Sequence, residues 1–124
     1  MRHRLKVKGL SRKTTARMSM LVAQVEAIVK HGKIKLTLPR AKQVRRIIEK
    51  LITKAKVDTV AARRTIESDL INKEVVKKIM ELGKTYLNRP GGYTRIIRLG
   101  ARKGDAAMMA LLELVAEEKK DEKK

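Results

Sequence analysis

The spacing of apolar residues changes twice in the first half of the chain, and this change limits the possible folds. From Met18 to Val29 apolar residues recur every three or four positions, as they do on one face of a helix. The segment "KIKLTL", residues 33–38, then alternates strictly between polar and apolar side chains, which is typical of a half-buried strand. The helical spacing returns from Ala41 to Ala55. The sequence therefore predicts a domain that combines helices with strands.

Local signals predict where the first elements begin and end. We expect the first helix over residues 15–31, with Thr14 or Thr15 as its N-cap. Gly32 can end this helix, because glycine tolerates the left-handed conformation after the last turn. Pro39 can open the next helix, where its missing N–H has no cost.

Two shorter helices are predicted in the middle of the chain. Asp58 or Thr59 can begin one of them. Asn72 can cap the other, and we expect Gly83 to end it. The spacing of Ile71 and Val76 also suggests a hydrophobic staple across the start of this second helix.

The final third contains a loop, a strand and one ambiguous segment. Residues 84–93 have loop composition, and "YTRIIRL", residues 93–99, has the β-branched content of a strand. "AAMMALLELVAEE" is rich in helix-forming residues, and Asp105 could cap it. A continuous apolar run can also be a buried strand, so local chemistry favours a helix without deciding the question.

The charge of the chain indicates an anionic partner. There are 32 Lys and Arg against 13 Asp and Glu, which gives a net charge of +19. Residues 1–25 carry seven basic residues and residues 82–104 carry six, with no acid in either segment. Nucleic acid is the first candidate partner and an anionic membrane the second. The tail, residues 116–124, has four charges of each sign and does not resemble a binding surface.

Several classes of site are excluded by residue type. The chain has no cysteine, and His3 and His31 are its only histidines, so we expect no metal. Its serines lack a glycine elbow, and its acids are mostly interleaved with lysines at helical spacing, so we expect no catalytic residue. No run reaches the ~18 apolar residues of a membrane span.

The stretch "RPGGYTRIIRLGARKGDAA", residues 89–107, combines glycines with arginines and lacks a P-loop pattern. Backbone can approach a ligand closely at Gly91 and Gly92, and arginine forks suit phosphates. Arg95 and Arg98 are three residues apart, so an ideal strand points them to opposite faces unless a bulge intervenes. Two tyrosines do not form a stacking platform, which favours contact with phosphates over base reading.

The basic residues and the glycine-rich stretch give a set of candidate contacts with nucleic acid. Those of the first rank are Arg2, His3, Arg4, Lys6, Lys8, Arg12, Lys13, Arg17, Arg89, Gly91, Gly92, Tyr93, Arg95, Arg98, Arg102 and Lys103. Those of the second rank share the polar side of one helix and are Lys42, Arg46 and Lys50.

Several motifs resemble a known family. They are "MRHR" at residues 1–4, "TLPRAK" at 37–42, "EKLIT" at 49–53, "KEVVKK" at 73–78, and above all "RPGGYTRI" with "LGARKGDAA". In this order the motifs resemble the bacterial family of large-subunit ribosomal proteins numbered seventeen, from Met1 to Val115. The chain departs from the family at Ala16, where a histidine is common, and at Leu36 and Thr37, where a Thr-Thr pair is common. The first departure puts one possible RNA contact in doubt, and neither disturbs the expected fold.

The resemblance implies a two-layer α+β fold, with helices packed on a small three-stranded mixed sheet in the order α-β-α-α-α-β-β. It therefore implies a strand over residues 108–115. The expected parts are a basic N-terminal arm (1–10), a single α+β domain (11–115) and a charged tail (116–124).

The resemblance also implies a function. It is that of a non-catalytic constituent of the cytoplasmic ribosome that binds large-subunit (23S) rRNA near the exit of the nascent-peptide tunnel, beside other ribosomal proteins. No cofactor or small-molecule substrate is expected of such a protein. Charge alone would also allow a DNA-compacting protein of the nucleoid, or a membrane-active or transit-targeted protein.

Overall fold

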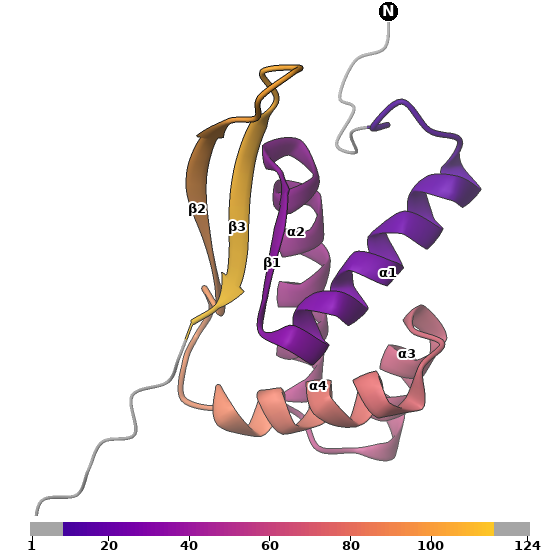
Figure 1. The fold of residues 1–124 in the computed structure, drawn as a ribbon. Coiled ribbons are helices and arrows are strands. Elements are labelled where there is room, and N and C mark those ends of the chain that lie inside the picture. Colours follow the sequence, from indigo (N-terminus) through magenta and orange to yellow (C-terminus); the bar gives the residue numbers. More distant parts are fainter. Residues whose placement is uncertain (1–8, 116–124) are drawn as a thin grey trace, which may run out of the picture.

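The computed structural model describes residues 9–115, which form four helices and three strands (Figure 1). In chain order these are α1 (Thr14–His31), β1 (Lys33–Thr37), α2 (Leu38–Ala55), α3 (Val60–Asp69), α4 (Lys73–Thr85), β2 (Thr94–Ala101) and β3 (Met108–Leu114). The class and the order α-β-α-α-α-β-β are those that the family resemblance implied. The N-terminal arm up to Lys8 and the tail from residue 116 lie outside the described residues.

The three strands form one antiparallel sheet in the order β1-β3-β2. The expectation of a mixed sheet was wrong in this detail. β1 and β2 run in the same direction, but β3 lies between them and pairs antiparallel with both. No parallel pair is therefore hydrogen-bonded in the described sheet.

The helices cover one face of the sheet (Figure 1). α1 and α2 pack directly on it, whereas α3 and α4 pack mainly on the other helices. α2 contacts every other helix and strand of the described chain. Its stripe of Ala41, Val44, Ile48, Leu51 and Ala55 is buried, as the helical spacing predicted.

The core consists of aliphatic side chains and one pair of tyrosines. Val25, Ile28, Ile48 and Ile79 are fully buried and come from three different helices. Leu112 of β3 is also fully buried and faces these helices. Because there is no Phe or Trp, closely packed aliphatic side chains fill most of the space between the layers.

The start of α1 differs from the prediction. Lys13 occupies the N-cap position and no side chain caps the helix. Thr14 and Thr15 already lie within the first turn, so their hydroxyls are past the position from which a cap reaches the free backbone N–H groups. At the other end Gly32 has φ 79° and its N–H donates to Ile28 O, as expected of a helix-ending glycine.

Gly83 does not end α4, which continues to Thr85. The residue is buried where α4 crosses α2. A Cβ at Gly83 would lie 2.4 Å from the carbonyl oxygen of Ala55. The glycine is therefore required by the close approach of two helices, and the prediction that it ends the helix was wrong.

The staple predicted between Ile71 and Val76 is absent. Val76 is buried, but Ile71 is 93% exposed and cannot be packed against it. Asn72 does cap α4, because its Oδ1 accepts from the N–H of Glu74, and Thr59 caps α3 by accepting from Ala62 N.

The ambiguous last segment is a strand, β3, as the family resemblance implied and against its local preference for helix. Ala110 and Leu112 are fully buried and face the helices. Hydrogen bonds to strands on both sides satisfy the backbone, and this tertiary pairing outweighs a helical preference of tenths of a kcal/mol per residue.

Candidate RNA-binding surface

A row of basic side chains runs along the exposed side of α2. Lys42, Arg46 and Lys50 follow one another at four-residue spacing, so they lie on one side of the helix. All three are exposed. Lys42 and Lys50 make no ion pair within residues 9–115, so both ammonium groups are available to an anion.

The glycine-rich turn after α4 lies beside this row. One cleft is lined by Arg46, Glu49, Lys50, Thr53 and Lys54 of α2 together with Gly91 and Tyr93. The structure thus joins two of the second-rank candidates, Arg46 and Lys50, to the first-rank stretch 89–93. Sequence spacing gave no signal for this neighbourhood, because about forty residues separate Lys50 from Gly91.

Contacts with α2 hold the turn in place. The ammonium group of Lys56 donates to the carbonyl oxygen of Arg89. Arg89 Nη1 donates to Gly92 O over 3.3 Å, so part of this guanidinium is used within the turn itself. Gly92 has φ 64°, a conformation that L-residues rarely adopt, which explains a glycine at this position.

Tyr93 lies behind the turn and is only 1% exposed. Its ring packs on Tyr86 with centroids 5.3 Å apart, and the Lys56 ammonium lies 4.8 Å from its centroid. Burial alone would raise the pKa of the Tyr93 hydroxyl, but hydrogen bonds with Lys56 and Thr53 and the charge of Lys56 lower it below 10.0. The ring is closed to a nucleic-acid base, and Tyr93 instead supports the turn.

The acid within the cleft is engaged by neighbouring residues. Glu49 Oε1 accepts from Thr94 Oγ1 over 2.9 Å and lies 3.4 Å from Arg45 Nε. These contacts direct the carboxylate toward β2 and Arg45. Arg46, Lys50 and Lys54 therefore dominate the charge at the mouth of the cleft.

The two arginines of β2 lie on opposite sides of the sheet. Arg95 pairs in register with Glu113, and its Nε donates to Glu113 Oε1 over 2.7 Å. Arg98 pairs in register with Ala110, which faces the helices. The Arg98 side chain is nevertheless exposed, because β2 is an edge strand. The bulge of this strand falls between Arg98 and Gly100, too late to bring both arginines to one face. Arg98 makes no ion pair within the described residues.

The hairpin between β2 and β3 presents Arg102 and Lys103. Arg102 forms a bidentate ion pair with Asp105, and Asp105 Oδ1 also accepts from Ala107 N. The Arg102 guanidinium, helped by that N–H, lowers the pKa of Asp105 to about 2. Lys103 makes no ion pair within residues 9–115, so its ammonium group is more available to a phosphate than the Arg102 guanidinium is.

The remaining first-rank candidates lie around the start of α1. Arg12 and Lys13 are exposed, and Arg12 Nη1 donates to Leu10 O over 3.3 Å. Arg17 is half-buried, and its guanidinium lies beside Gly9. Arg2, His3, Arg4, Lys6 and Lys8 fall outside the described residues.

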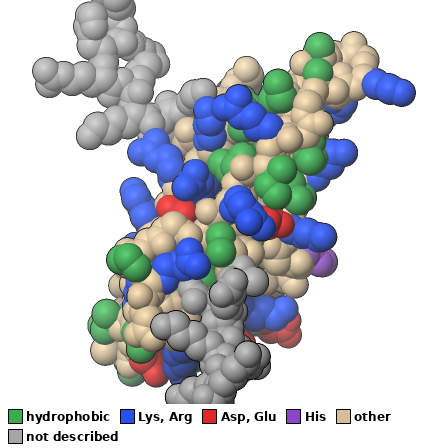
Figure 2. All heavy atoms as spheres, turned by 90° about the vertical axis from the view of Figure 1, so that its left-hand side faces the viewer, with side chains coloured by type: hydrophobic (Ala, Val, Ile, Leu, Met, Phe, Trp, Pro, Cys, Tyr) green, Lys and Arg blue, Asp and Glu red, His purple; other side chains and the backbone are tan. Residues whose placement is uncertain are grey.

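The open face of the sheet adds two lysines that sequence reasoning did not select. Lys33 and Lys35 of β1 are exposed and lie in register with Glu113 and Leu111 of β3. Figure 2 shows the side of the molecule that carries β2, where basic side chains are widely spread, with hydrophobic ones between them and few acids. The strict alternation of "KIKLTL" could have identified these lysines as a solvent-facing pair.

Other kinds of site find little support. Residues 9–115 contain no cluster of three His, Cys, Asp or Glu side chains able to hold a metal ion. None of the helices in this part of the chain is long and apolar enough to cross a membrane.

Comparison with known proteins identifies the family. Residues 20–115 match the family described as "Ribosomal protein L17". The chain is also 49% identical over 116 residues to "Large ribosomal subunit protein bL17" of Dictyoglomus thermophilum, an alignment that covers 93% of this chain and all of that protein. The chain therefore belongs to the ribosomal protein L17 family.

Proposed function

We propose that this protein is a structural, non-catalytic constituent of the large ribosomal subunit and binds 23S rRNA mainly through phosphates, near the exit of the nascent-peptide tunnel. Family membership supports the ribosomal role and the presence of neighbouring ribosomal proteins as partners. The position near the tunnel exit follows the resemblance to the family.

One observation carries the RNA-binding part of the proposal: the cleft between α2 and the turn at Gly91 and Gly92. It brings Arg46 and Lys50 beside the backbone of Gly91, and the carboxylate in the cleft, Glu49, is held by Thr94 and Arg45. A sugar–phosphate backbone can approach glycine closely and place its phosphates near the cations of α2. Tyr93, the aromatic residue of the cleft lining, is buried, which favours phosphate contact over base stacking.

The flanking candidates extend this surface. Arg98, Lys103, Arg12 and Lys13 are exposed and offer further phosphate contacts. Arg95 and Arg102 contribute less, because each already holds a carboxylate. Gly91 provides the close approach, Gly92 allows the turn through its positive φ, and Tyr93 supports the turn from behind.

The salt dependence of binding to a 23S rRNA fragment tests this surface. Replacing Lys42, Arg46 and Lys50 with alanine removes up to three phosphate contacts. We expect the slope of log K against log[salt] to become less negative by about 0.7 to 0.9 for each phosphate that is no longer neutralised, hence by about 2 to 3 in total. The matched control replaces Lys73, Lys77 and Lys78 of α4, which removes the same charge from outside the cleft. Equal slopes for the two triple variants would refute the placement of the surface.

Two further measurements test the ribosomal role. The protein should remain with large subunits after a high-salt wash, and its crosslinks should map to rRNA around the tunnel exit. Affinity for duplex DNA equal to that for the rRNA fragment, together with absence from washed subunits, would favour a nucleoid protein instead.

A further inference from the structure

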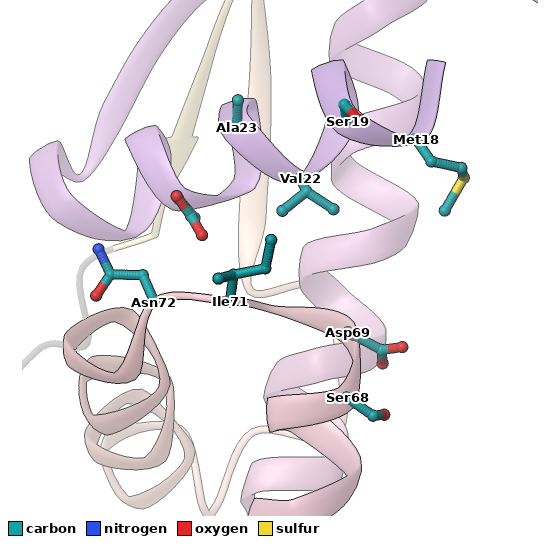
Figure 3. Close-up of a pocket in the computed structure, with 9 residues that line it drawn as sticks. Met18, Ser19, Val22, Ala23, Ser68, Asp69, Ile71 and Asn72 are labelled. Carbon is teal, nitrogen blue, oxygen red and sulfur yellow. The ribbon is translucent and has the colours of Figure 1, made fainter. Parts of the chain in front are cut away.

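A groove lies between α1 and the turn that joins α3 to α4 (Figure 3). Its α1 side is formed by Met18, Ser19, Val22, Ala23 and Glu26, and its other side by Ser68, Asp69, Ile71 and Asn72. Val22 and Ile71 point toward one another across it (Figure 3). None of these residues was selected as a candidate RNA contact.

The groove exposes large apolar side chains. Ile71 is 93% exposed and Met18 is 49% exposed. An isoleucine in this position costs solubility and adds nothing to the core of the isolated chain, so the exposed side chain favours a partner that covers it. Methionine is flexible and can adapt to the shape of such a partner.

The charges of the groove differ from those of the rest of the chain. In a protein with a net charge of +19, the residues lining the groove include Glu26 and Asp69 but no Lys or Arg. Glu26 makes no ion pair within residues 9–115. Asp69 lies 3.7 Å from Lys54, but both side chains are about half exposed, so a partner cation can compete with this weak pair. The two carboxylates of the groove therefore favour a lysine or arginine over a phosphate.

The groove continues into a second hollow that shares Met18, Val22 and Asp69. This hollow reaches Ile47 and Leu51 of α2 and Leu70 at the end of α3, all of them apolar. Lys50 and Lys54 line its far side. The combined groove can therefore accept several consecutive apolar residues, with a cation preferred at the end that holds Glu26.

We infer that this groove binds a segment of a neighbouring large-subunit protein that combines apolar side chains with lysine or arginine. The inference rests on the proposed function, because it takes its partner from the same ribosomal particle. The apolar residues of the segment cover Ile71 and Met18, and its cation faces Glu26. RNA is disfavoured by the carboxylates, and a second copy of this chain is a separate outcome of the crosslinking test.

A photo-crosslinking amino acid in place of Ile71 tests the inference in purified large subunits. The side chain is almost fully exposed, so its replacement leaves the core unchanged. We expect a crosslink to one protein segment that carries apolar residues and at least one lysine or arginine. A crosslinker in place of Val60, which is 66% exposed and outside the groove, is the matched control and should not give this product.

Crosslinks from position 71 to rRNA, to an acidic segment or to a second copy of this chain would overturn the inference, as would the absence of any crosslink. A second variant tests whether a cation of the partner faces Glu26. Glu26→Lys should lower the crosslink yield about tenfold, the effect expected when one important contact of an interface is removed. Glu67→Lys, on an exposed site of α3 outside the groove, should leave the yield unchanged. An unchanged yield with Glu26→Lys would refute the inference that a lysine or arginine of the partner faces Glu26.

The two proposals fail in different ways. If the unmodified protein is missing from washed large subunits, the proposed function fails. If the protein is present and its affinity for rRNA is unchanged, but position 71 gives no protein crosslink, only the groove proposal fails.

Discussion

Gly83 determines how closely two helices of the core can approach. A Cβ at this position would meet the backbone carbonyl of Ala55 at 2.4 Å, and a backbone atom cannot move aside as a flexible side chain can. The contact between α2 and α4 therefore depends on the absence of a side chain at one residue.

Gly83→Ala should lower the free energy of unfolding by about 2 kcal/mol, because the steric clash outweighs the roughly 1 kcal/mol that alanine gains over glycine in a helix. Urea unfolding followed by far-ultraviolet circular dichroism measures this difference. Gly91→Ala is the control, since a Cβ there would have no neighbour within 4 Å and the stability should stay within about 0.5 kcal/mol. A neutral Gly83→Ala would contradict the close packing of α2 on α4.

The ion pair between Arg102 and Asp105 should make the stability of the β2–β3 hairpin depend on pH. The pKa of Asp105 lies at about 2, below its ordinary value of 3.8, first because of Arg102 and then because of the N–H of Ala107. A lowered folded-state pKa means that the pair favours the folded hairpin above about pH 4, and that this preference is lost as the pH falls toward 2.

Carbon-13 nuclear magnetic resonance of the Asp105 carboxyl measures this pKa directly. Arg102→Gln should raise it toward 3.8 while the N–H of Ala107 keeps it somewhat below that value. Lys103→Gln removes the same charge one residue away and should change it little. Similar pKa values in both variants would show that general charge, rather than the Arg102 contact, sets the titration.

At the scale of the helices and strands, capping distinguishes α3 from α1. Thr59 accepts from Ala62 N over 3.2 Å, whereas no side chain caps α1. Thr59→Ala should therefore cost about 1 kcal/mol of stability, and Thr14→Ala should cost much less. Thermal unfolding of the two variants provides the comparison. A larger destabilisation by Thr14→Ala would contradict the observed caps.

The elements were largely predictable because their apolar spacing and glycines act locally. The bounds of α1 and α2 follow from the residues that bury one face, and Gly32 and Asn72 perform the roles that their chemistry indicated. Gly83, Ile71 and β3 were less predictable from local chemistry. For Gly83 and β3 the decisive contact involves a partner that is distant in the sequence, namely Ala55 or the flanking strands. For Ile71 the predicted partner, Val76, is close in the sequence, and the contact is not formed because Ile71 faces solvent.

At the scale of the whole molecule, repulsion between like charges opposes folding. The 32 basic side chains repel one another over distances that salt can screen, while the ion pairs on the helices are exposed and weak. The isolated protein should therefore become more stable as salt concentration rises.

Raising sodium chloride from about 10 mM to 0.5 M should raise the midpoint of thermal unfolding by several degrees, because screening shortens the Debye length from about 30 Å to less than about 8 Å. Circular dichroism at 222 nm follows the transition. A variant in which several exposed lysines are replaced with glutamine should show a smaller increase. A midpoint that falls with salt would mean that the ion pairs outweigh the repulsion.

The composition of the candidate surface was predictable from charge, but its geometry was not. The candidate lysines Lys42, Lys50 and Lys103 are exposed, as a phosphate contact requires. Tyr93 looked like a contact residue and is buried, because its ring packs on Tyr86 and its hydroxyl accepts a hydrogen bond from Thr53 of α2. Arg95 forms an ion pair and Arg98 does not, because the register of the strands places Glu113 opposite Arg95. Strand register could not be read from the sequence.

The packing of Tyr86 on Tyr93 has a practical consequence for spectroscopy. These are the only aromatic side chains of the Phe, Tyr and Trp type in the chain, and they lie together at one buried joint. Ultraviolet fluorescence therefore comes from this joint alone, free of any tryptophan signal. Once absorption by the RNA bases is corrected for, a change in tyrosine emission on adding RNA would report a change at this joint, which supports the turn at Gly91 and Gly92, without an attached dye.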